Sequence, residues 1–297
     1  MSNEISFGRL ITAMVTPFKA DGSVNYEMAI ELGHYLIENG TDTILLSGTT
    51  GESPTLTHEE EFTLYKEMIA VFKGKVKLMA GTGSNCTRTA VTSSQKAQEL
   101  GIDAVLQVSP YYNKPSQEGL YQHFKMVADN TDIPILLYNI PGRTSVNIAP
   151  ETMARLAEIP AIIGVKEAAG SVDQLIEIRK ACPEDFILYS GDDGLTLDFM
   201  KEGACGVVSV ASHIAGKEIQ EMMAAYVSKN LEEATVLNTK LSPLFEALFL
   251  TSNPVPVKAA LGLIGFSVGD PRLPLVPLTS AEKTQLEIVL DRYLEST

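Results

Sequence analysis

The sequence predicts an α/β fold, a (β/α)8 TIM barrel followed by a C-terminal α-helical domain. Two observations lead to this prediction. Short apolar runs of strand type recur along the first three-quarters of the 297 residues, and segments with helical periodicity lie between them. Eight strand–helix units at this spacing are enough to close a barrel. The predicted strands are Leu10–Val15, Thr43–Leu46, Lys77–Ala80, Ala104–Val108, Pro134–Tyr138, Ile162–Lys166, Ile187–Ser190 and Gly206–Ser209.

Local signals place helices between these strands. Apolar residues three and four apart run from Tyr26 to Ile37 and again from Phe62 to Phe72. Thr57-His-Glu-Glu60 forms a capping box at the start of the second of these helices, and Pro150 stands where a first helical turn tolerates proline. The order strand, helix, strand, helix therefore continues along the chain.

A doubly wound open sheet is the alternative fold, and a dinucleotide-dependent enzyme would accompany it. Such sheets usually have fewer strands. The one glycine-rich stretch after a predicted strand, Gly81-Thr-Gly-Ser-Asn85, also lacks the third glycine of the dinucleotide fingerprint. Both points favour the barrel.

Strand-type runs stop near residue 229, so we expect a catalytic barrel over residues 1–229 and a helical domain over residues 230–297. No linker of any length separates the two parts. The tail consists of an apolar stripe from Ala234 to Leu248, then Asn253-Pro-Val-Pro-Val-Lys258, a proline-rich link around Pro271–Pro277 and a last helix from the Thr279-Ser-Ala-Glu282 cap to about Leu294.

Charge and composition exclude several classes of partner. The formal net charge of −14 provides no basic footprint for nucleic acid or an anionic membrane, and no apolar run approaches the ~18 residues of a membrane span. Cys86, Cys182 and Cys205 lie far apart without CxxC spacing, and Glu4 and Arg9 interrupt the start of the chain as no signal peptide does. We expect a cytoplasmic protein. Its four histidines never occur at metal-ligand spacing, so we expect no metal.

Lys166 is the most informative residue at a predicted strand end. It follows Ala161-Ile-Ile-Gly-Val165 and therefore points into the barrel or lies just above it. Burial disfavours the charged form of an amine, and a neutral lysine attacks a carbonyl carbon to form a Schiff base. The alternative is a structural lysine paired with Glu167 or another acid, because an unpaired buried ammonium is costly.

Polar groups near other strand ends fit an imine-forming site. Tyr138 offers a phenol for proton relay, and Thr49 and Thr50 stand between glycines that let the backbone approach a carboxylate. Arg143 follows a Pro-Gly turn that can aim a guanidinium at a second carboxylate. The alternatives without a function are a core aromatic for Tyr138, a simple turn for the threonines and a solvated surface side chain for Arg143. The pair Asp192-Asp193 predicts a helix cap rather than a metal site.

Five motifs stand in order at these strand ends: Gly48-Thr-Thr-Gly-Glu52, Tyr111-Tyr-Asn-Lys-Pro115, Tyr138-Asn-Ile-Pro-Gly-Arg-Thr144, Gly164-Val-Lys-Glu167 and Ser190-Gly-Asp-Asp193. Together they resemble the dihydrodipicolinate synthase (4-hydroxy-tetrahydrodipicolinate synthase) family of the N-acetylneuraminate lyase superfamily of class I pyruvate aldolases. The resemblance spans essentially the whole chain. It implies a (β/α)8 barrel with a C-terminal helical domain that condenses pyruvate with L-aspartate 4-semialdehyde in lysine and diaminopimelate biosynthesis, without a cofactor.

The resemblance also implies roles for matching residues. Lys166 would form the imine with pyruvate, and Thr50 with neighbouring backbone N–H groups would hold the pyruvate carboxylate. Arg143 would bind the carboxylate of the semialdehyde. Gly191 and Val208 would line the site through their backbone.

A proton relay and an assembly are implied as well. Tyr138, Thr49 and Tyr112 match the relay of the family, in which the tyrosine after the fourth strand comes from an adjacent subunit. Family members usually form tetramers built from tight dimers, and a minority are dimers. We therefore expect a homo-oligomer, a tetramer rather than a dimer.

An inhibitor site for lysine matches the family only in part. Asn85, His58 and Tyr111 fit it, whereas Glu61 and Thr89 stand where lysine-inhibited members carry a histidine and a glutamate. Loss of a carboxylate that would pair with the amine of the inhibitor weakens binding by about 1.5–3 kcal/mol. We expect a vestigial lysine-inhibitor site and insensitivity to lysine.

Two other functions are compatible with the fold. N-acetylneuraminate lyase and 2-keto-3-deoxy sugar acid aldolases share the imine chemistry but generally lack an arginine at the position of Arg143, because a neutral sugar offers no second carboxylate. A ligand-binding or structural barrel without turnover is the other, since a fold does not prove activity. The intact set Lys166, Tyr138, Thr49 and Tyr112 argues against it.

Overall fold

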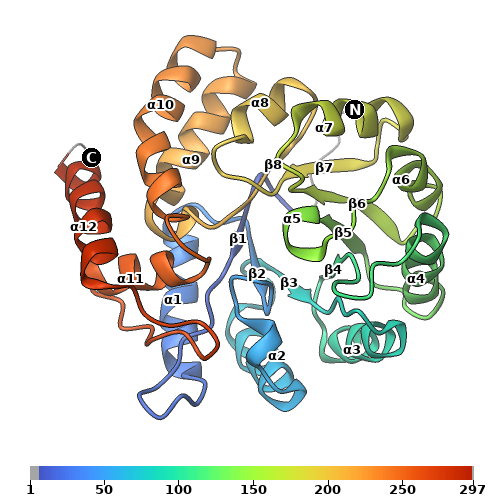
Figure 1. Ribbon diagram of the computed structural model, residues 1–297, viewed down its shortest axis with the longest axis horizontal. Helices are drawn as coiled ribbons and strands as arrows, with labels where there is room; N and C mark the ends of the chain where they lie inside the picture. Colours follow the sequence, from blue (N-terminus) through green and yellow to red (C-terminus); the bar gives the residue numbers. More distant parts are fainter. Residues whose placement is uncertain (1–6, 296–297) are drawn as a thin grey trace.

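The computed structural model describes residues 7–295 and contains a closed barrel of eight parallel strands (Figure 1). The strands follow one another around the barrel in sequence order, and β8 closes it by pairing with β1. This confirms the predicted TIM barrel and excludes the doubly wound sheet. The strands are β1 (Leu10–Ala13), β2 (Thr43–Leu46), β3 (Lys77–Gly81), β4 (Ala104–Val108), β5 (Ile135–Asn139), β6 (Ile162–Glu167), β7 (Ile187–Ser190) and β8 (Gly206–Ser209).

The first strand is shorter than predicted. It ends at Ala13, although the backbone N–H of Met14 still donates to the carbonyl of Leu45 at 3.0 Å. The next N–H, that of Val15, donates instead to Nε2 of His213 at 3.1 Å. A side chain from α9 therefore replaces the neighbouring strand as hydrogen-bond partner, and the ladder stops.

Helices surround the barrel, as the periodicity predicted (Figure 1). Thr57 and Glu60 form the expected capping box, with the Glu60 N–H donating to Thr57 Oγ1 and the Thr57 N–H donating to Glu60 Oε2. The helices are α1 (Tyr26–Glu38), α2 (His58–Phe72), α3 (Thr87–Leu100), α4 (Gln117–Asp129), α5 (Pro141–Thr144), α6 (Pro150–Ala157), α7 (Val172–Ala181), α8 (Thr196–Lys201) and α9 (Ser212–Val227), with a 3-10 turn, η1 (Ser53–Thr55), before α2.

The strands separate two apolar clusters, because successive side chains of a strand point to opposite faces. Leu136 and Tyr138 of β5 belong to the cluster inside the barrel, whereas Leu137 belongs to the larger cluster between the barrel and its helices. On β6 the same alternation places Val165 in the outer cluster. The next side chain, Lys166, therefore points inward.

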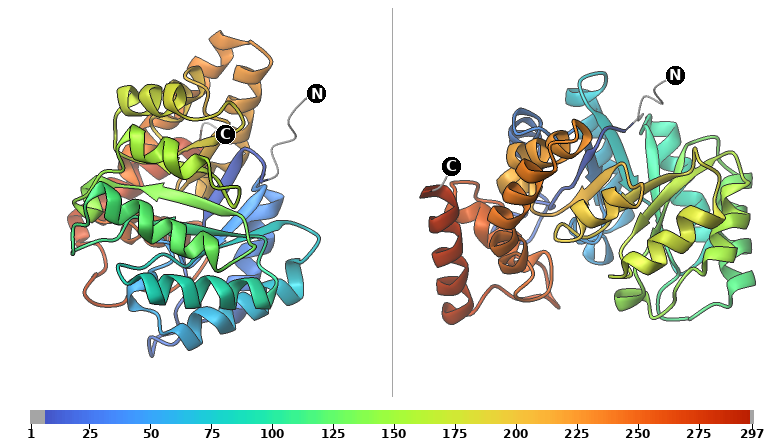
Figure 2. Two further views of the ribbon diagram at one scale, coloured as in Figure 1. Left: turned by 90° about the vertical axis from the view of Figure 1, so that its right-hand side faces the viewer. Right: turned by 90° about the horizontal axis from the view of Figure 1, so that it is seen from above.

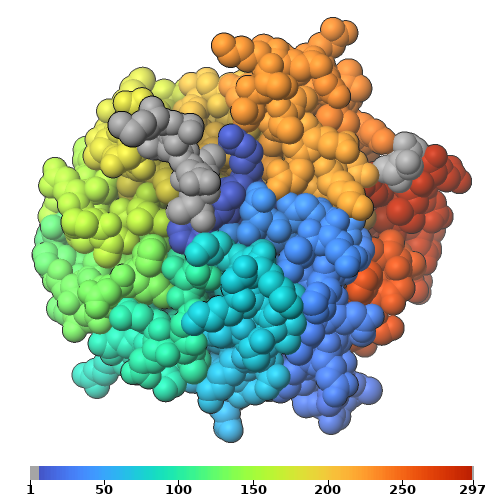
Figure 3. Space-filling view, turned by 180° about the vertical axis from the view of Figure 1, so that it is seen from behind, coloured from blue at the N-terminus to red at the C-terminus, as the bar shows by residue number. Residues whose placement is uncertain are grey.

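The predicted helical tail is α10 (Leu231–Ala247), α11 (Val255–Leu263) and α12 (Ser280–Glu295), which lie on one side of the barrel (Figure 2). Seen from behind, the red C-terminal part of the surface flanks the blue N-terminal part (Figure 3). Tyr35 of α1 and Phe266, in the segment after α11, are in contact there, with ring centroids 4.4 Å apart. The domain boundary at residue 229 stays a prediction.

No helix among residues 7–295 is both long enough and apolar enough to cross a bilayer. The prediction about the start of the chain rests on Glu4 and Arg9, and residues 1–6 lie outside the described residues. The part of the prediction that concerns Glu4 therefore falls outside the described residues.

Candidate active site

Lys166 is buried at the end of β6 and has no ion pair with any carboxylate of the described chain. Its register partners are Tyr138 on β5 and Tyr189 on β7, and its Nζ lies 4.3 Å from the ring centroid of Tyr138. Burial lowers the pKa of Lys166 to about 8, opposed by the charge of Asp193 and aided by that of Arg143. The neutral, nucleophilic amine is therefore a minor form near neutral pH, but it is far more populated than at the ordinary pKa of 10.5.

Glu167, the alternative partner of Lys166, points to the other face of the sheet. It is fully buried, and its carboxylate accepts hydrogen bonds from Asn139 Nδ2 at 2.9 Å and from the Ala169 N–H at 2.7 Å. Burial raises the pKa of Glu167 to about 7 against these bonds. Because adjacent residues of a strand face opposite ways, Glu167 is a structural acid behind the barrel wall and not the counter-charge of Lys166.

Tyr138 and Thr49 lie together on the rim above Lys166. Burial raises the pKa of Tyr138 to about 12, while the charge of Arg143 and a hydrogen bond with Thr49 act in the opposite direction. Thr49 belongs to the loop after β2, and Arg143 lies exposed on α5 after β5. Three strand ends thus bring an amine, a phenol, a guanidinium and the Thr49 hydroxyl to one place.

A small cavity joins these groups at the C-terminal end of the barrel. Gly191 lies in its wall, where a Cβ would come within 3.0 Å of Lys166 Cε and 2.6 Å of Ala168 Cβ, so any larger residue would displace the lysine. Val208 is buried inside the barrel and paired in register with Ile11, and the role predicted for its backbone stays a prediction. Val210 is a further residue of the cavity wall. The wall includes Thr49, Thr50, Tyr138, Arg143, Lys166, Gly191, Val210, Phe249 and Asn253.

Thr50 contacts a cavity residue that the sequence interpretation did not identify. Asn253, between α10 and α11, donates from Nδ2 to Thr50 Oγ1 at 2.9 Å. The sequence places the motif that begins at Asn253 in the helical tail, where it supports the family resemblance without indicating a role in the site. Its separation of 203 residues from Thr50 leaves no local signal of the contact.

The pair Asp192-Asp193 divides into two different roles. Asp192 Oδ1 accepts from the N–H groups of Gly194 and Leu195 before α8, close to the predicted cap. Asp193 does not cap this helix. Its buried carboxylate accepts from the backbone N–H groups of Val210 and Ala211, at 3.0 and 2.9 Å, and from the Ser209 hydroxyl, and so connects β7 to the end of β8.

Tyr112 does not reach the cavity within one chain. It lies in the loop after β4, its side chain is 90% exposed, and its φ of 73° is left-handed. The neighbouring Asn113 ties this loop to the chain by donating to the Asn85 carbonyl at 2.8 Å. The loop therefore presents the phenol of Tyr112 outward.

A second, separate cavity contains most of the residues predicted for the lysine-inhibitor site. His58, Glu61, Thr89 and Tyr111 line it, whereas Asn85 does not. Glu61 is buried, its Oε2 lies 3.0 Å from Nδ1 of His58, and burial raises its pKa. The carboxylate of this cavity is thus already engaged with a histidine.

Among residues 7–295, no group of three or more His, Cys, Asp or Glu side chains is arranged to hold a metal ion. Lysine, tyrosine, threonine, arginine and asparagine side chains supply the polar groups of the barrel cavity. These groups suit covalent and acid–base chemistry on a small carboxylate-bearing carbonyl compound.

Comparisons with known proteins show which family the chain resembles. Residues 6–293 match the model of the dihydrodipicolinate synthetase family. A 4-hydroxy-tetrahydrodipicolinate synthase of Thermosynechococcus vestitus is 55% identical over 286 residues, which cover 96% of this chain and 97% of that protein. The crystal structure of a dihydrodipicolinate synthase from Bacillus anthracis superposes with a TM-score of 0.95 at 49% identity, covering 97% and 98% of the two chains. The enzyme of Cyanidioschyzon merolae, solved with lysine bound, gives 0.95 at 48% identity, with the same coverage.

Proposed function

We propose residue roles from the premise that the chain belongs to the dihydrodipicolinate synthetase family and condenses pyruvate with L-aspartate 4-semialdehyde in lysine and diaminopimelate biosynthesis. It is a lyase, a 4-hydroxy-tetrahydrodipicolinate synthase. The observation that carries the residue assignments is the buried, unpaired amine of Lys166 at the C-terminal end of the barrel. A lysine that is equally buried but paired with a carboxylate would stay protonated and would not act as a nucleophile.

Lys166 adds to the carbonyl carbon of pyruvate, and loss of water gives an imine. Removal of a proton from the methyl group then produces an enamine, whose carbon attacks the aldehyde of the second substrate. The amine of that substrate finally displaces Lys166 from the former keto carbon and closes the ring of the product. Each step moves a proton at a carbon, nitrogen or oxygen beside Lys166, so a relay is needed.

Tyr138, Thr49 and Tyr112 form this relay. Tyr138 and Thr49 are in contact within one chain, whereas Tyr112 projects from the surface and so suits the cavity of an adjacent subunit. The active unit is accordingly at least a dimer, and we propose a tetramer of tight dimers. The free thiols of all three cysteines fit a cytoplasmic location, and we place the domain boundary at residues 229 and 230.

Thr50 and Arg143 hold the two carboxylates. Thr50, buried beside Lys166 in the cavity wall, donates to the carboxylate of pyruvate. Arg143 stands exposed at the mouth, where a guanidinium binds the carboxylate of the incoming semialdehyde in two-point fashion. Gly191 leaves room for the Lys166 side chain between them.

The test compares two aldehydes on the wild-type protein and on Arg143→Ala. We expect efficient turnover of pyruvate with aspartate 4-semialdehyde and none with N-acetylmannosamine. In Arg143→Ala the kcat/KM for the semialdehyde falls about 100-fold, while borohydride still traps pyruvate on Lys166. Preference for N-acetylmannosamine would indicate a sugar acid aldolase instead. Failure of borohydride to trap pyruvate on the wild-type protein would contradict the imine mechanism.

The relay assignment of Tyr112 has its own test. Tyr112→Phe lowers kcat but leaves borohydride-trapped imine intact, because the relay fails while Lys166 stays competent. When equal amounts of Tyr112→Phe and Lys166→Ala are mixed and form hybrid oligomers, part of the activity returns, because some sites then combine a wild-type Lys166 with a wild-type Tyr112 from the other subunit. Loss of the trapped imine in Tyr112→Phe alone would contradict the assignment.

We also propose that lysine does not inhibit this enzyme. Thr89 offers no carboxylate to the amine of lysine, and Glu61 is engaged with His58. Steady-state assays with millimolar lysine then show no loss of rate, and Thr89→Glu gains sensitivity. Inhibition of the wild-type protein by millimolar or lower lysine would overturn the proposal.

A further inference from the structure

Two segments far apart in the sequence meet at the loop that carries Thr49 and Thr50. This loop follows β2, and the segment Asn253–Lys258 begins α11 near the other end of the chain. Asn253 hydrogen-bonds to Thr50, and Lys258 pairs with Glu52 at the end of the same loop. The C-terminal helices thus contact the loop at two points.

The contact of Asn253 determines how the Thr50 hydroxyl is used. Thr50 Oγ1 accepts from Asn253 Nδ2 at 2.9 Å, so the hydroxyl proton remains for another acceptor. Within the described chain no protein atom accepts from this hydroxyl, and Thr50 lines the cavity beside Lys166. The proton is therefore available for donation into the cavity.

Asn253 itself has an unsatisfied group in the same cavity. The residue is 6% exposed, and its Oδ1 is buried without a hydrogen-bond partner among residues 7–295. A buried acceptor of this kind costs stability, and in native structures such groups call for an explanation. The acceptor belongs to a residue of the cavity wall, and its lack of a partner marks Asn253 as a residue whose role is more than structural.

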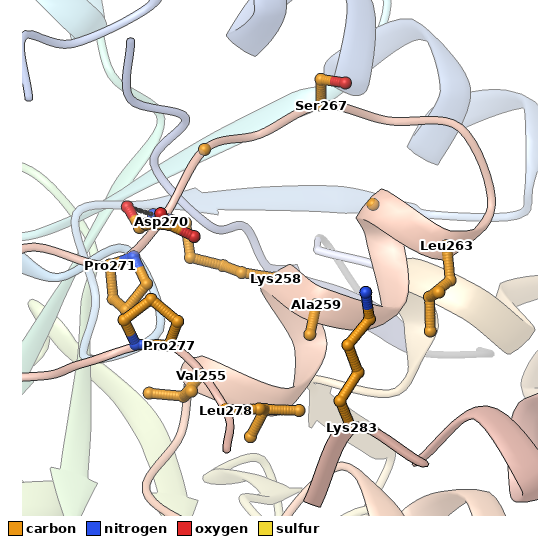
Figure 4. Close-up of a pocket in the computed structure, with 12 residues that line it drawn as sticks. Val255, Lys258, Ala259, Leu263, Ser267, Asp270, Pro271, Pro277, Leu278 and Lys283 are labelled. Atoms are coloured by element: carbon orange, nitrogen blue, oxygen red, sulfur yellow. Dashed lines mark hydrogen bonds between the residues drawn. The ribbon is translucent and has the colours of Figure 1, made fainter. Parts of the chain in front are cut away.

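Lys258 anchors the loop from the other side. Its Nζ lies 2.7 Å from Glu52 Oε1, and both side chains are 2% exposed. The Arg272 N–H donates to the second oxygen of Glu52 at 2.9 Å, and Lys258 also donates to the Asp270 carbonyl at 3.3 Å (Figure 4). Glu52 has a left-handed φ of 56°, so contacts of this kind hold the loop in a conformation that a glutamate rarely adopts.

We propose that Asn253 is a positioning residue for the reaction, which keeps the Thr50 hydroxyl oriented as a donor to the carboxylate of the keto acid. Lys258 supports it by fixing Glu52 and hence the loop. The inference deepens the proposed role of Thr50 and rests on it. It places control of the first substrate partly in the C-terminal helices, outside the barrel.

The ranking of two variants tests the orientation of the hydroxyl. Asn253→Ala raises the KM for pyruvate about tenfold, the worth of one hydrogen bond to a charged group. Asn253→Asp raises it further, because the new carboxylate accepts the Thr50 proton and repels the carboxylate of pyruvate. A merely structural role gives the opposite ranking, since aspartate keeps the shape of asparagine. The KM for the semialdehyde at saturating pyruvate changes less than about twofold in both.

A double-mutant cycle with Thr50→Val separates this inference from the role of Thr50. Asn253→Ala adds little to the pyruvate KM once the hydroxyl is absent, because both changes remove the same interaction. Borohydride trapping of pyruvate at low concentrations gives the same comparison without the aldehyde. Lys283→Met, on α12 in the wall of the neighbouring cavity, is the matched control in the same helices (Figure 4).

The outcomes are distinct. A raised KM in Thr50→Val with an unchanged KM in both Asn253 variants would overturn the positioning role and keep Thr50 as the carboxylate ligand. An unchanged KM in Thr50→Val would overturn both. Additive effects in the double variant, or a lowered Tm as the only change, would show that Asn253 is structural. The proposal is supported if the KM for pyruvate rises in Asn253→Ala, rises further in Asn253→Asp, and changes non-additively in the double variant with Thr50→Val.

Discussion

Lys166 and Lys258 are both buried lysines, at 6% and 3% exposure, yet their surroundings differ. Each ammonium group faces an aromatic ring, with 4.3 Å from Nζ to the centroid of Tyr138 and 4.1 Å to that of Phe18. Lys258 has a carboxylate at 2.7 Å, whereas Lys166 has none within ion-pair distance. Under the proposed function, a missing counter-charge, more than burial or aromatic contact, distinguishes the reactive lysine from the structural one.

The same contrast explains the electrostatics of the two sites. Burial lowers the pKa of both lysines, and for Lys258 the charge and hydrogen bond of Glu52 oppose this effect. The buried pair is further satisfied by the N–H of Arg272 and the carbonyl of Asp270. Around Lys166 the opposing charge is that of Asp193, whose carboxylate accepts hydrogen bonds from Ser209, Val210 and Ala211. Its amine therefore stays available.

The largest expected effect follows from Lys166→Met. Turnover falls by about 10³-fold or more, because the covalent intermediate cannot form. The free energy of unfolding rises or stays the same, because an unpaired buried amine is replaced by an apolar side chain of similar length. Steady-state kinetics and chemical denaturation measure both quantities. A marked loss of stability would mean that Lys166 has a structural partner after all.

Lys258→Met tests the paired lysine of this comparison. It leaves Glu52 buried and unpaired, so we expect a loss of about 3–5 kcal/mol in the free energy of unfolding. The double variant Lys258→Met with Glu52→Gln recovers a large part of this loss, because neither charge remains. Equal stability of the single and double variants, in denaturant titrations with Lys283→Met as control, would refute a pairwise interaction.

Tyr138→Phe separates the ring beside Lys166 from its hydroxyl. The ring contact with Lys166 is kept, so pyruvate is still trapped by borohydride, whereas kcat falls about 100-fold because the relay lacks its phenol. Phe18, under Lys258, has no hydroxyl to lose, and the variant Phe18→Leu affects stability without a specific loss in kcat. Equal kcat in Tyr138→Phe and the wild-type protein would exclude Tyr138 from the relay.

The smallest effects concern pH. Lys166 has a pKa lowered to about 8 from 10.5, so the rate of imine trapping at low pyruvate rises about tenfold per pH unit up to pH 8 and then levels off. Between these two values the unfolded chain binds more protons than the folded chain, so stability rises with pH across this window. In Lys166→Met that rise is absent. A trapping rate that is flat from pH 6 to 9 would contradict the lowered pKa.

The sequence could predict the barrel and the position of Lys166 because both depend on local patterns. Strand-type runs and helical periodicity repeat at regular spacing, and catalytic groups of such barrels lie where the runs end. The period of two along β6 could also have excluded Glu167 as the partner of Lys166, since neighbours on a strand face opposite sides. This alternation of side chains along β6 is a local signal that the sequence itself contains.

Other parts of the site depend on contacts that no local pattern encodes. Asp193 satisfies a rule for helix caps, yet the tertiary structure directs its carboxylate to Val210 and Ala211. Val210, which follows the end of β8 at Ser209, lines the cavity although it lies outside the predicted strand. Asn253 reaches Thr50 across 203 residues, so only the folded arrangement identifies it.

The pairing of Glu52 with Lys258 also has a meaning for the order in which the protein is made. Glu52 leaves the ribosome 206 residues before its partner, and the loop it closes bears Thr50, the proposed ligand of the first substrate. Until the last quarter of the chain has been translated, this carboxylate has no counter-charge and must stay in water. A nascent or prematurely terminated barrel can therefore possess Lys166 and still lack a settled binding loop, which ties competence for catalysis to completion of synthesis.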